Sequence, residues 1–420
     1  MLNEKTMTKL RLICILLFPT LVYAQVNLTG VVLNKKTQQP IEYVTVYING
    51  STQGTITDSR GFFEFESLTL PCQLVVSHVS FITKSITVTS ENPEQLEILL
   101  IPKKVDLSVL EVEDDNLRLA NLRRFTADFL GSDYWGVKAK LINDEVLTFR
   151  TEYYPKEFDI TEANRQMYKT YYEDQDVEWS ADSTVVAVQT KSKFSVSADE
   201  PLIVDLPLLG YEVHVNLIDF TVYHQLGNMS TYLAYYYFKP YAEVSRRKSR
   251  RYSKNRKEVY YNSSQHFCRS LFANELAENG YVLLERLRAD TMDASQDVNL
   301  VKPIMSSRFS SQGDDFLYRK LDGFLPMDSV GVDEKQIVGF ENRDYIILYY
   351  HNADGSPRDL RNKKKWSIFS QSKIHFASDT CLISRNGIVS DYSVMFGGEM
   401  STKQVGALLP DDYQPNEDEQ

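Results

Sequence analysis

Short runs of alternating apolar and polar residues, separated by turn residues, fill the chain from Val26 to Pro102. In the segment EYVTVYI, the aliphatic residues Val44, Val46 and Ile48 alternate with tyrosine and threonine. Because successive side chains of a strand point to opposite faces of a sheet, this period of two predicts strands with one buried face. Regular spacing of such runs is typical of an all-β sandwich.

The stretch GTITDSRGFFEF, residues 54–65, joins two of these runs. Its threonines, charges and phenylalanines raise the question of whether it is a functional site or a corner of the fold. Residues 58–61 have the composition of a turn, and Gly61 can take a positive φ without steric cost. We therefore interpret the stretch as a corner between two strands.

Several short motifs follow one another in a fixed order through this part of the chain. They are Gly30-Val31-Val32, Gln39-Pro40-Ile41, Val44-Thr45-Val46, Gly54-Thr55-Ile56-Thr57-Asp58, Gly61-Phe62-Phe63 and Val76-Ser77-His78-Val79-Ser80-Phe81. Together they resemble the carboxypeptidase regulatory-like domain, which stands at the front of many exported proteins of Bacteroidetes. The resemblance implies a transthyretin-like β-sandwich of about seven strands. It also implies a module without catalysis of its own.

The first 24 residues have the pattern of a secretory signal peptide. Lys5, Lys9 and Arg11 precede the apolar run LICILLFPTLVYA, which is too short to span a bilayer as a stable helix and ends at the small residue Ala24. We expect cleavage before Gln25 and export to the periplasm or to the periplasmic face of the outer membrane. After residue 24 the sequence contains no unbroken apolar stretch of membrane-spanning length.

The net charge excludes one class of partner. The chain of 420 residues has a formal charge of −11, and removing the three cations and one acid of the signal peptide lowers it to −13. A surface so acidic repels polyanions, so we expect no nucleic-acid partner. Hydrophobic residues at 43% and charged residues at 25% are typical of a globular protein, and 26 tyrosines with 21 phenylalanines favour β structure.

The length allows two or three domains. We predict a mainly β protein, in which an N-terminal transthyretin-like β-sandwich precedes a larger β-rich α+β domain with at least two helices. The segment KKVDLSVLEVEDDN gains charge and loses aromatic residues, as a linker does. The expected organisation is a signal peptide at 1–24, the sandwich at 25–102, this linker at 103–116, a β-rich domain of unassigned function at 117–414 and an acidic tail at 415–420.

Two segments of the second region carry apolar residues at helical spacing. The first, residues 116–130, ends before Gly131 and has four such residues on one face: Leu119, Leu122, Phe125 and Phe129. The second, residues 263–279, ends before Gly280, and we expect a similar face to dock on a sheet: Cys268, Leu271, Phe272 and Leu276. Strand-like runs occupy residues 146–154, 183–190, 193–198, 211–225, 230–238, 345–351, 366–377 and 381–394.

Short patches of the second region also have a resemblance. They lie at residues 129–131, 142–143, 255–256, 264–267 and 408–413, and they are similar to landmarks of Bacteroidetes proteins of this size that carry a carboxypeptidase regulatory-like domain. This resemblance implies no activity for the second region.

The sequence contains no recognisable catalytic or cofactor motif. The zinc patterns His-x-x-Glu and His-Glu-x-x-His are absent, as are a Gly-x-Ser-x-Gly elbow and a phosphate-binding glycine loop. His351 and Asp354 come closest to a metal-binding pair, in the turn HNADGSP, which we interpret as a solvated hairpin tip. Cys72, Cys268 and Cys381 are interpreted as buried hydrophobes, with a bridge between the last two as the alternative. We expect no catalytic residue, no metal ligand and no cofactor.

One segment departs from the acidic background. SRRKSRRYSKNRKE holds eight cations within twelve positions: Arg246, Arg247, Lys248, Arg250, Arg251, Lys254, Arg256 and Lys257. One interpretation is a solvated loop between two strands. The other is contact with an anionic surface, such as lipid head groups or lipopolysaccharide phosphates, at about 1 kcal/mol per nearby cation. His266, further along, is expected to cap a helix or pack in a core.

Three functions from different classes fit the sequence. The favoured one is a non-catalytic, exported binding or scaffolding protein of the cell envelope, whose partner is an envelope protein or a glycan. The second is an unrecognised periplasmic hydrolase of glycans or peptides, which a pocket with converging carboxylates would support. The third is a peripheral accessory protein of the outer membrane that uses the basic segment on an anionic membrane surface.

Overall fold

The computed structural model describes residues 26–89, 95–103, 115–159, 161, 177–179, 185–224, 229–287, 300–301, 317–320, 327–330, 334–338, 343–357, 370–376, 378, 380–389 and 394–415. The chain divides into two compact units. The first comprises Met1–Asn49 and Gly54–Val105, and the second comprises Gly50–Gln53 and Asp106–Gln420. The expected signal peptide, most of the expected linker and the last five residues of the expected tail lie outside the described residues.

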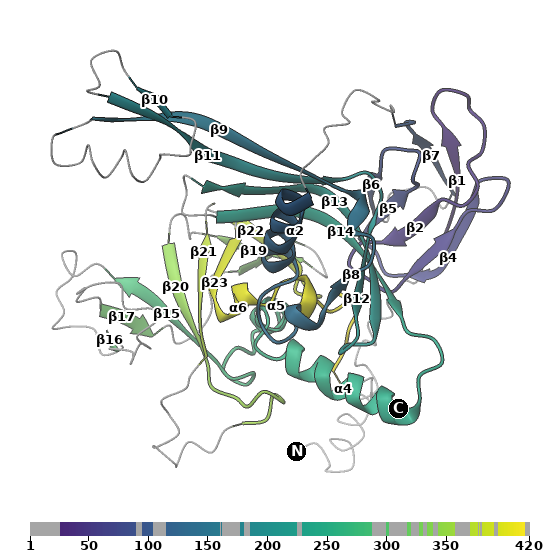
Figure 1. Cartoon of the computed structure of the whole chain (residues 1–420). Helices are drawn as coiled ribbons and strands as arrows, with labels where there is room; N and C mark the ends of the chain where they lie inside the picture. The colour runs from purple at the N-terminus through teal and green to yellow at the C-terminus, as the bar shows by residue number, and fades with distance from the viewer. Residues whose placement is uncertain are drawn as a thin grey trace, which may run out of the picture. The chain divides into compact units, whose positions relative to one another are not determined.

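The described part of the first unit consists of seven strands (Figure 1): β1 (Val26–Asn34), β2 (Thr45–Ile48), β3 (Gly54–Ile56), β4 (Phe62–Leu68), β5 (Cys72–Ser77), β6 (Lys84–Val88) and β7 (Gln95–Leu100). They form two sheets, in the orders β4-β1-β7 and β3-β2-β5-β6. β1 pairs antiparallel with β4 and parallel with β7. Inward side chains of both sheets, such as Val32, Val46 and Phe63, share one core. The predicted β-sandwich is therefore confirmed.

Residues 58–61 form the predicted corner between β3 and β4. The carboxylate of Asp58 accepts hydrogen bonds from the backbone N–H groups of Arg60 and Phe62, both at 2.9 Å. Gly61 has a φ of +71°, and a Cβ atom there would lie 2.5 Å from the carbonyl oxygen of Val32. The stretch is thus built around a turn that only glycine can close.

The first sheet of the second unit has seven strands: β8 (Lys140–Leu141), β9 (Leu147–Asp159), β10 (Val177–Trp179), β11 (Val185–Ala198), β12 (Leu202–Leu206), β13 (Tyr211–Tyr223) and β14 (Met229–Pro240). Its order is β10-β11-β13-β12-β8, with β9 beside β11 and β14 beside β13. The two runs predicted at 183–190 and 193–198 are one strand, β11. A register shift between Lys191 and Lys193 interrupts the alternation there, which is why the sequence looks like two strands.

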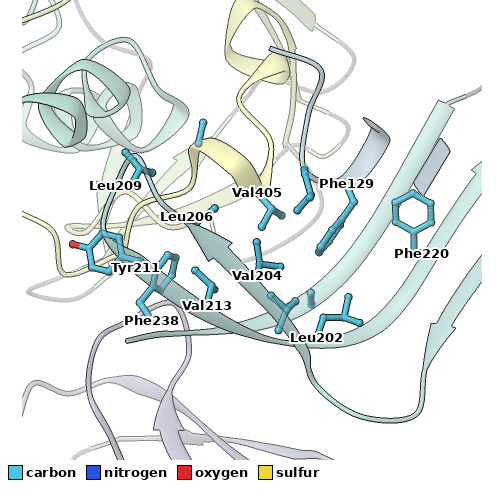
Figure 2. Close-up of a cluster of buried hydrophobic side chains, with 14 of the residues drawn as sticks. Phe129, Leu202, Val204, Leu206, Leu209, Tyr211, Val213, Phe220, Phe238 and Val405 are labelled. Atoms are coloured by element: carbon cyan, nitrogen blue, oxygen red, sulfur yellow. The ribbon is translucent and has the colours of Figure 1, made fainter. Parts of the chain in front are cut away.

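Helix α2 (Asp115–Phe129) packs its aromatic residues on this sheet (Figure 1). The ring of Phe125 lies 4.9 Å from that of Phe220 on β13, and the ring of Phe129 lies 5.3 Å from that of Tyr232 on β14. Figure 2 shows Phe129 and Val405 above the apolar side chains of the strands. Burial of each such side chain contributes roughly 1.5–3 kcal/mol to the free energy of unfolding.

The helix predicted over residues 116–130 is confirmed, but one residue of its predicted buried face is misplaced. Leu119 is 51% exposed. At 100° per residue, Leu119 lies about 90° around the helix from the stripe formed by Leu122, Phe125 and Phe129, and the sheet covers only that stripe.

The remaining strands of the second unit are β15 (Tyr281–Leu287), β16 (Leu300–Val301), β17 (Leu317–Lys320), β18 (Met327–Ser329), β19 (Glu334–Val338), β20 (Arg343–Tyr349), β21 (Ser370–Phe376), β22 (Thr380–Ser384) and β23 (Val394–Gly398). They form a six-stranded sheet, β16-β17-β15-β20-β21-β23, and a three-stranded sheet, β18-β19-β22. Among the described residues of this unit, three further stretches are α-helices: α4 (Arg246–Tyr260), α5 (Ser264–Ala273) and α6 (Glu399–Thr402). Among the described residues of both units, strands are more numerous than helices. The predicted mainly β fold class is therefore confirmed.

Helix α5 docks its apolar face on strands of these sheets, as predicted. Phe267, Cys268 and Leu271 share a core with residues of β15, β20, β21 and β22. The helix is shorter than predicted, because Asn274 adopts a left-handed conformation and its N–H donates to carbonyl groups of the last turn. Cys268 and Cys381 are buried in this core and are not joined by a disulfide, which agrees with the interpretation of these two as buried hydrophobes.

Candidate binding site on helix α4

The basic segment is a helix, so the interpretation as a loop between strands is wrong. Helix α4 begins after Ser245, whose side chain accepts a hydrogen bond from the N–H of Lys248. Arginine and lysine are good helix formers, and the buried residues Tyr252, Val259 and Tyr260 lie seven and eight positions apart, on one face. That stripe is the signal in the sequence that identifies the helix, although eight cations obscure it.

Three residues of α4 hold it on the turn between β12 and β13. Tyr252 lies against Gly210, which has a φ of +75°, and a Cβ atom at Gly210 would stand 2.5 Å from the tyrosine ring. Asn255 donates a hydrogen bond to the carbonyl group of Leu208 at 2.8 Å. Arg256 donates to the carbonyl group of Leu209 at 2.9 Å. The helix is therefore fixed along its buried face.

A lysine from a distant part of the chain binds the C-terminal end of α4. The ammonium group of Lys403 donates to the carbonyl oxygens of Val259 and Tyr261, each at 2.9 Å. These are terminal carbonyl groups, where the helix dipole favours a cation. Burial lowers the pKa of Lys403 to about 8, although nearby carboxylates oppose that shift. This contact joins residues more than 140 positions apart, and no local pattern predicts it.

The eight predicted cations separate into two groups. Arg256 and Lys257 are half-buried, and Arg256 serves the docking of the helix rather than an external surface. The other six are exposed: Arg246, Arg247, Lys248, Arg250, Arg251 and Lys254. None of these six makes an ion pair within the described residues. We call these six residues the exposed cation group.

The exposed cation group lowers the stability of helix α4. Three of its members, Arg246, Arg247 and Lys248, occupy the first turn, where the helix dipole repels cations by about 0.3–1 kcal/mol each. Like charges also stand four residues apart, as in the pair of Arg246 and Arg250, which costs roughly 0.2–0.5 kcal/mol per pair. A neighbouring anion would relieve both repulsions, so the arrangement favours an anionic partner.

A pocket of about 470 Å³ lies between α4 and the turn HNADGSP. One helix face supplies one wall, with Arg250, Ser253, Lys254, Lys257 and Glu258. The turn supplies the other, with Asn352, Ala353 and Asp354. The basic segment and the turn are separate features of the sequence, and the structure brings them together. The helix residues of the pocket have the spacing of one side of a helix: 250, 253, 254, 257 and 258. No local sequence pattern predicts which turn faces them.

The turn that faces α4 is held in place at both ends. His351 packs on Gly280, where a Cβ atom would lie 2.4 Å from the imidazole ring, and Gly355 lies equally close to the ring of Tyr261. Asp354 accepts hydrogen bonds from the N–H and hydroxyl of Ser356, and these bonds lower the pKa of its carboxyl group. The predicted turn is thus present with an exposed tip, whereas His351 itself is buried.

His266 packs inside the second unit, as expected. Its Nδ1 atom lies 2.8 Å from the hydroxyl of Tyr281, and its backbone N–H donates to the hydroxyl of Ser263 at the start of α5. Burial lowers the pKa of His266 to about 3, so the imidazole is neutral at physiological pH. The side chain is only 4% exposed, so it does not face a substrate from solvent.

Neither a metal cluster nor a membrane-spanning helix is found among the described residues. In the part of the chain that the structure describes, no three histidine, cysteine, aspartate or glutamate residues are placed to share a metal ion. Among the same residues, no helix has the length and hydropathy to cross a bilayer.

A family comparison agrees with the sandwich described above. A model of the CarboxypepD_reg-like domain matches residues 28–112. These residues form a CarboxypepD_reg-like domain. The matched range includes most of β1 and all of β2 to β7, and the domain is consistent with a binding module without catalysis. No curated protein matches the sequence significantly.

Two solved structures show remote likenesses to the chain. A type II cohesin–X-dockerin complex from Acetivibrio cellulolyticus has 20% identity over 23% of this chain and 72% of the other, with a TM-score of 0.17. A protein of unknown function from Bacteroides fragilis has 9% identity over 52% of this chain and 99% of the other, with a TM-score of 0.16. At these TM-scores neither likeness supports an inference about fold or function.

Proposed function

We propose that this chain is an exported, non-catalytic binding protein of the cell envelope, and that helix α4 is its contact with an anionic surface. The protein would act in the periplasm or on the periplasmic face of the outer membrane. The CarboxypepD_reg-like domain of the first unit would serve as a further binding or scaffolding module. The observation that carries the proposal is the exposed cation group, whose charges destabilise their own helix and have no ion-pair partner among the described residues.

Helix geometry supports one shared direction for most of these charges. At 100° per residue, Arg246, Arg247, Arg250, Arg251 and Lys254 fall within an arc of about 140°. This arc is centred opposite the buried stripe of α4. Each cation near an anionic membrane contributes about 1 kcal/mol, so five together contribute on the order of 5 kcal/mol. That is enough for reversible association with such a surface without an acyl anchor or an apolar insertion.

Co-sedimentation with lipid vesicles tests the proposal. We expect the full chain to bind vesicles of phosphatidylglycerol and phosphatidylcholine but not vesicles of phosphatidylcholine alone. Because the contact is exposed to solvent, raising the ionic strength from about 0.05 M to about 0.5 M should release the protein. Binding that is equal on both vesicle types, or that is insensitive to salt, would contradict the proposal.

A further inference from the structure

The pocket beside the exposed cation group has a mixed charge that a bare anion does not explain. Its lining combines the cations Arg250, Lys254 and Lys257 with the carboxylates of Glu258 and Asp354. Neither Arg250 nor Lys254 has an ion-pair partner among the residues described. A simple phosphate would gain from the cations, but the two carboxylates would repel it. The helix wall, with three cations and the carboxylate of Glu258, is net positive, whereas the turn carries only the carboxylate of Asp354. The lining therefore favours a ligand with an anionic group toward α4 and hydrogen-bond donors toward the turn.

We propose that this pocket binds a phosphorylated sugar, with the phosphate on the cations of α4 and the sugar hydroxyls on the turn 352–354. Lysine and arginine donate charge-assisted hydrogen bonds to phosphate oxygens. Ionised carboxylates only accept hydrogen bonds, and hydroxyl groups of a sugar donate them. The side chain of Asn352 can do both, which suits a ring that carries hydroxyls and ring oxygens.

The other lining residues argue against alternative ligands. None of the described residues that line the pocket is aromatic, whereas a nucleobase is usually held by stacking. Ala353 is the one apolar residue among the described lining residues, so the apolar part of that lining consists mainly of the aliphatic stems of lysine and arginine side chains rather than of a surface suited to an acyl chain. Its volume of about 470 Å³ lies within the range of roughly 300–1,000 Å³ that small-molecule sites occupy.

Both walls of the pocket are formed before any ligand arrives. Tyr252 on Gly210 fixes the helix wall, and His351 on Gly280 fixes the base of the turn. Asp354 is held by two hydrogen bonds to Ser356, and its lowered pKa keeps the carboxylate ionised as an acceptor. A pre-organised site loses little conformational entropy on binding, which favours a small polar ligand.

This inference deepens the proposed function, because Arg250 and Lys254 belong to both the exposed cation group and the pocket. The phosphorylated sugar could be free or could be the head group of a glycolipid in the surface that α4 contacts. The chemistry is the same in both cases. Two matched sets of vesicles, with and without a phosphorylated glycolipid, separate these two sources.

Isothermal titration calorimetry of the full chain tests the pocket directly. We expect glucose 1-phosphate to bind at least tenfold more tightly than either glucose or inorganic phosphate. Asp354→Ala should weaken binding of glucose 1-phosphate about tenfold. The affinity for inorganic phosphate should stay the same or rise slightly. Equal affinities for glucose 1-phosphate and phosphate would overturn the proposal, as would tighter binding of ADP or of a phosphoserine peptide.

A second pair of variants separates the pocket from the surface contact. Ala353→Trp, at an exposed turn, should block the pocket and abolish binding of glucose 1-phosphate, while binding to phosphatidylglycerol vesicles persists. Charge reversal at Arg246, Arg247 and Arg251, which lie outside the pocket, should instead abolish binding to the vesicles. It should change the affinity for glucose 1-phosphate by less than about threefold at physiological salt. Retention of sugar-phosphate binding by the Ala353→Trp variant, with a native circular dichroism spectrum, would overturn the pocket assignment alone.

Discussion

The guanidinium carbon of Arg256 lies 4.1 Å from the centre of the Tyr211 ring. The same group donates a hydrogen bond to the carbonyl oxygen of Leu209. One side chain thus makes a cation–π contact with Tyr211 at the start of β13 and a hydrogen bond with the preceding turn, while the six cations of the exposed cation group remain exposed. This relationship separates the structural charge of α4 from the charges available to a partner.

Arg256→Lys is predicted to destabilise the protein by about 1–2 kcal/mol. A lysine ammonium cannot lie flat on the Tyr211 ring and reach the Leu209 carbonyl group in the same geometry. Urea unfolding followed by circular dichroism measures the change. Arg247→Lys, at an exposed position of the same helix, is the matched control and should stay within about 0.5 kcal/mol of the wild type. Equal effects of the two variants would contradict a docking role for Arg256.

Gly210→Ala is predicted to displace α4 from the sheet. The residue has a φ of +75°, and the new Cβ atom would meet the Tyr252 ring at 2.5 Å, so both backbone strain and overpacking arise. We expect a loss of at least ~2 kcal/mol in unfolding free energy.

Gly397→Ala offers a control for the effect of Gly210→Ala. Gly397 lies on β23, and a Cβ atom there would make an ordinary contact at 3.6 Å with the Cβ of Lys373. It should therefore change the stability much less. A Gly210→Ala variant as stable as Gly397→Ala would show that the close approach of Tyr252 is not needed.

Asp411 is predicted to make the stability depend on pH. Burial raises the pKa of its carboxyl group to about 7, against the opposing effect of Arg269. The folded state therefore binds a proton that the unfolded state releases near its ordinary pKa of about 4. The resulting stabilisation is fully present below pH 4 and is lost as the pH rises through 7.

Asp411→Asn tests this dependence. The wild type should lose on the order of 2 kcal/mol more than the variant between pH 4.5 and pH 7.5, as measured by urea unfolding at each pH. Glu275→Gln, at an exposed carboxylate after α5, should leave the pH profile of the wild type unchanged. Parallel profiles for the wild type and the Asp411→Asn variant would contradict a raised pKa at Asp411.

Local patterns predict the elements of this fold well where one face is buried and the other is solvated. The alternation in residues 42–48 predicts strand β2 and the composition of residues 58–61 predicts the corner, each within a few residues. Tyr47, which the alternation places on the solvated face, is buried. The aromatic residues Phe125 and Phe129 likewise identify α2, because their spacing matches a helix.

The candidate site is harder to predict, because it depends on contacts that are distant in sequence. In α4 the buried stripe of Tyr252, Val259 and Tyr260 contributes only three apolar residues among eight cations, so charge masks the period. The facing turn around Asp354 lies about a hundred positions further along the chain, and no local rule places it beside Lys254. The different role of Arg256 follows from the position of Tyr211, which only the tertiary structure provides.

The central claim is that the exposed cation group of α4 holds the protein on an anionic surface. Its most direct test compares the binding of two triple variants with that of the wild type on phosphatidylglycerol vesicles. One carries Arg246→Glu, Arg247→Glu and Arg251→Glu. The other carries the same charge change at exposed lysines elsewhere: Lys35→Glu, Lys36→Glu and Lys138→Glu.

We predict that the α4 variant loses at least ~100-fold in vesicle affinity, because three attractive charges of about 1 kcal/mol each become repulsive. The matched variant should retain affinity within about threefold of the wild type. An equal loss in both variants would show that net charge alone governs binding, and an unchanged α4 variant would contradict the claim outright.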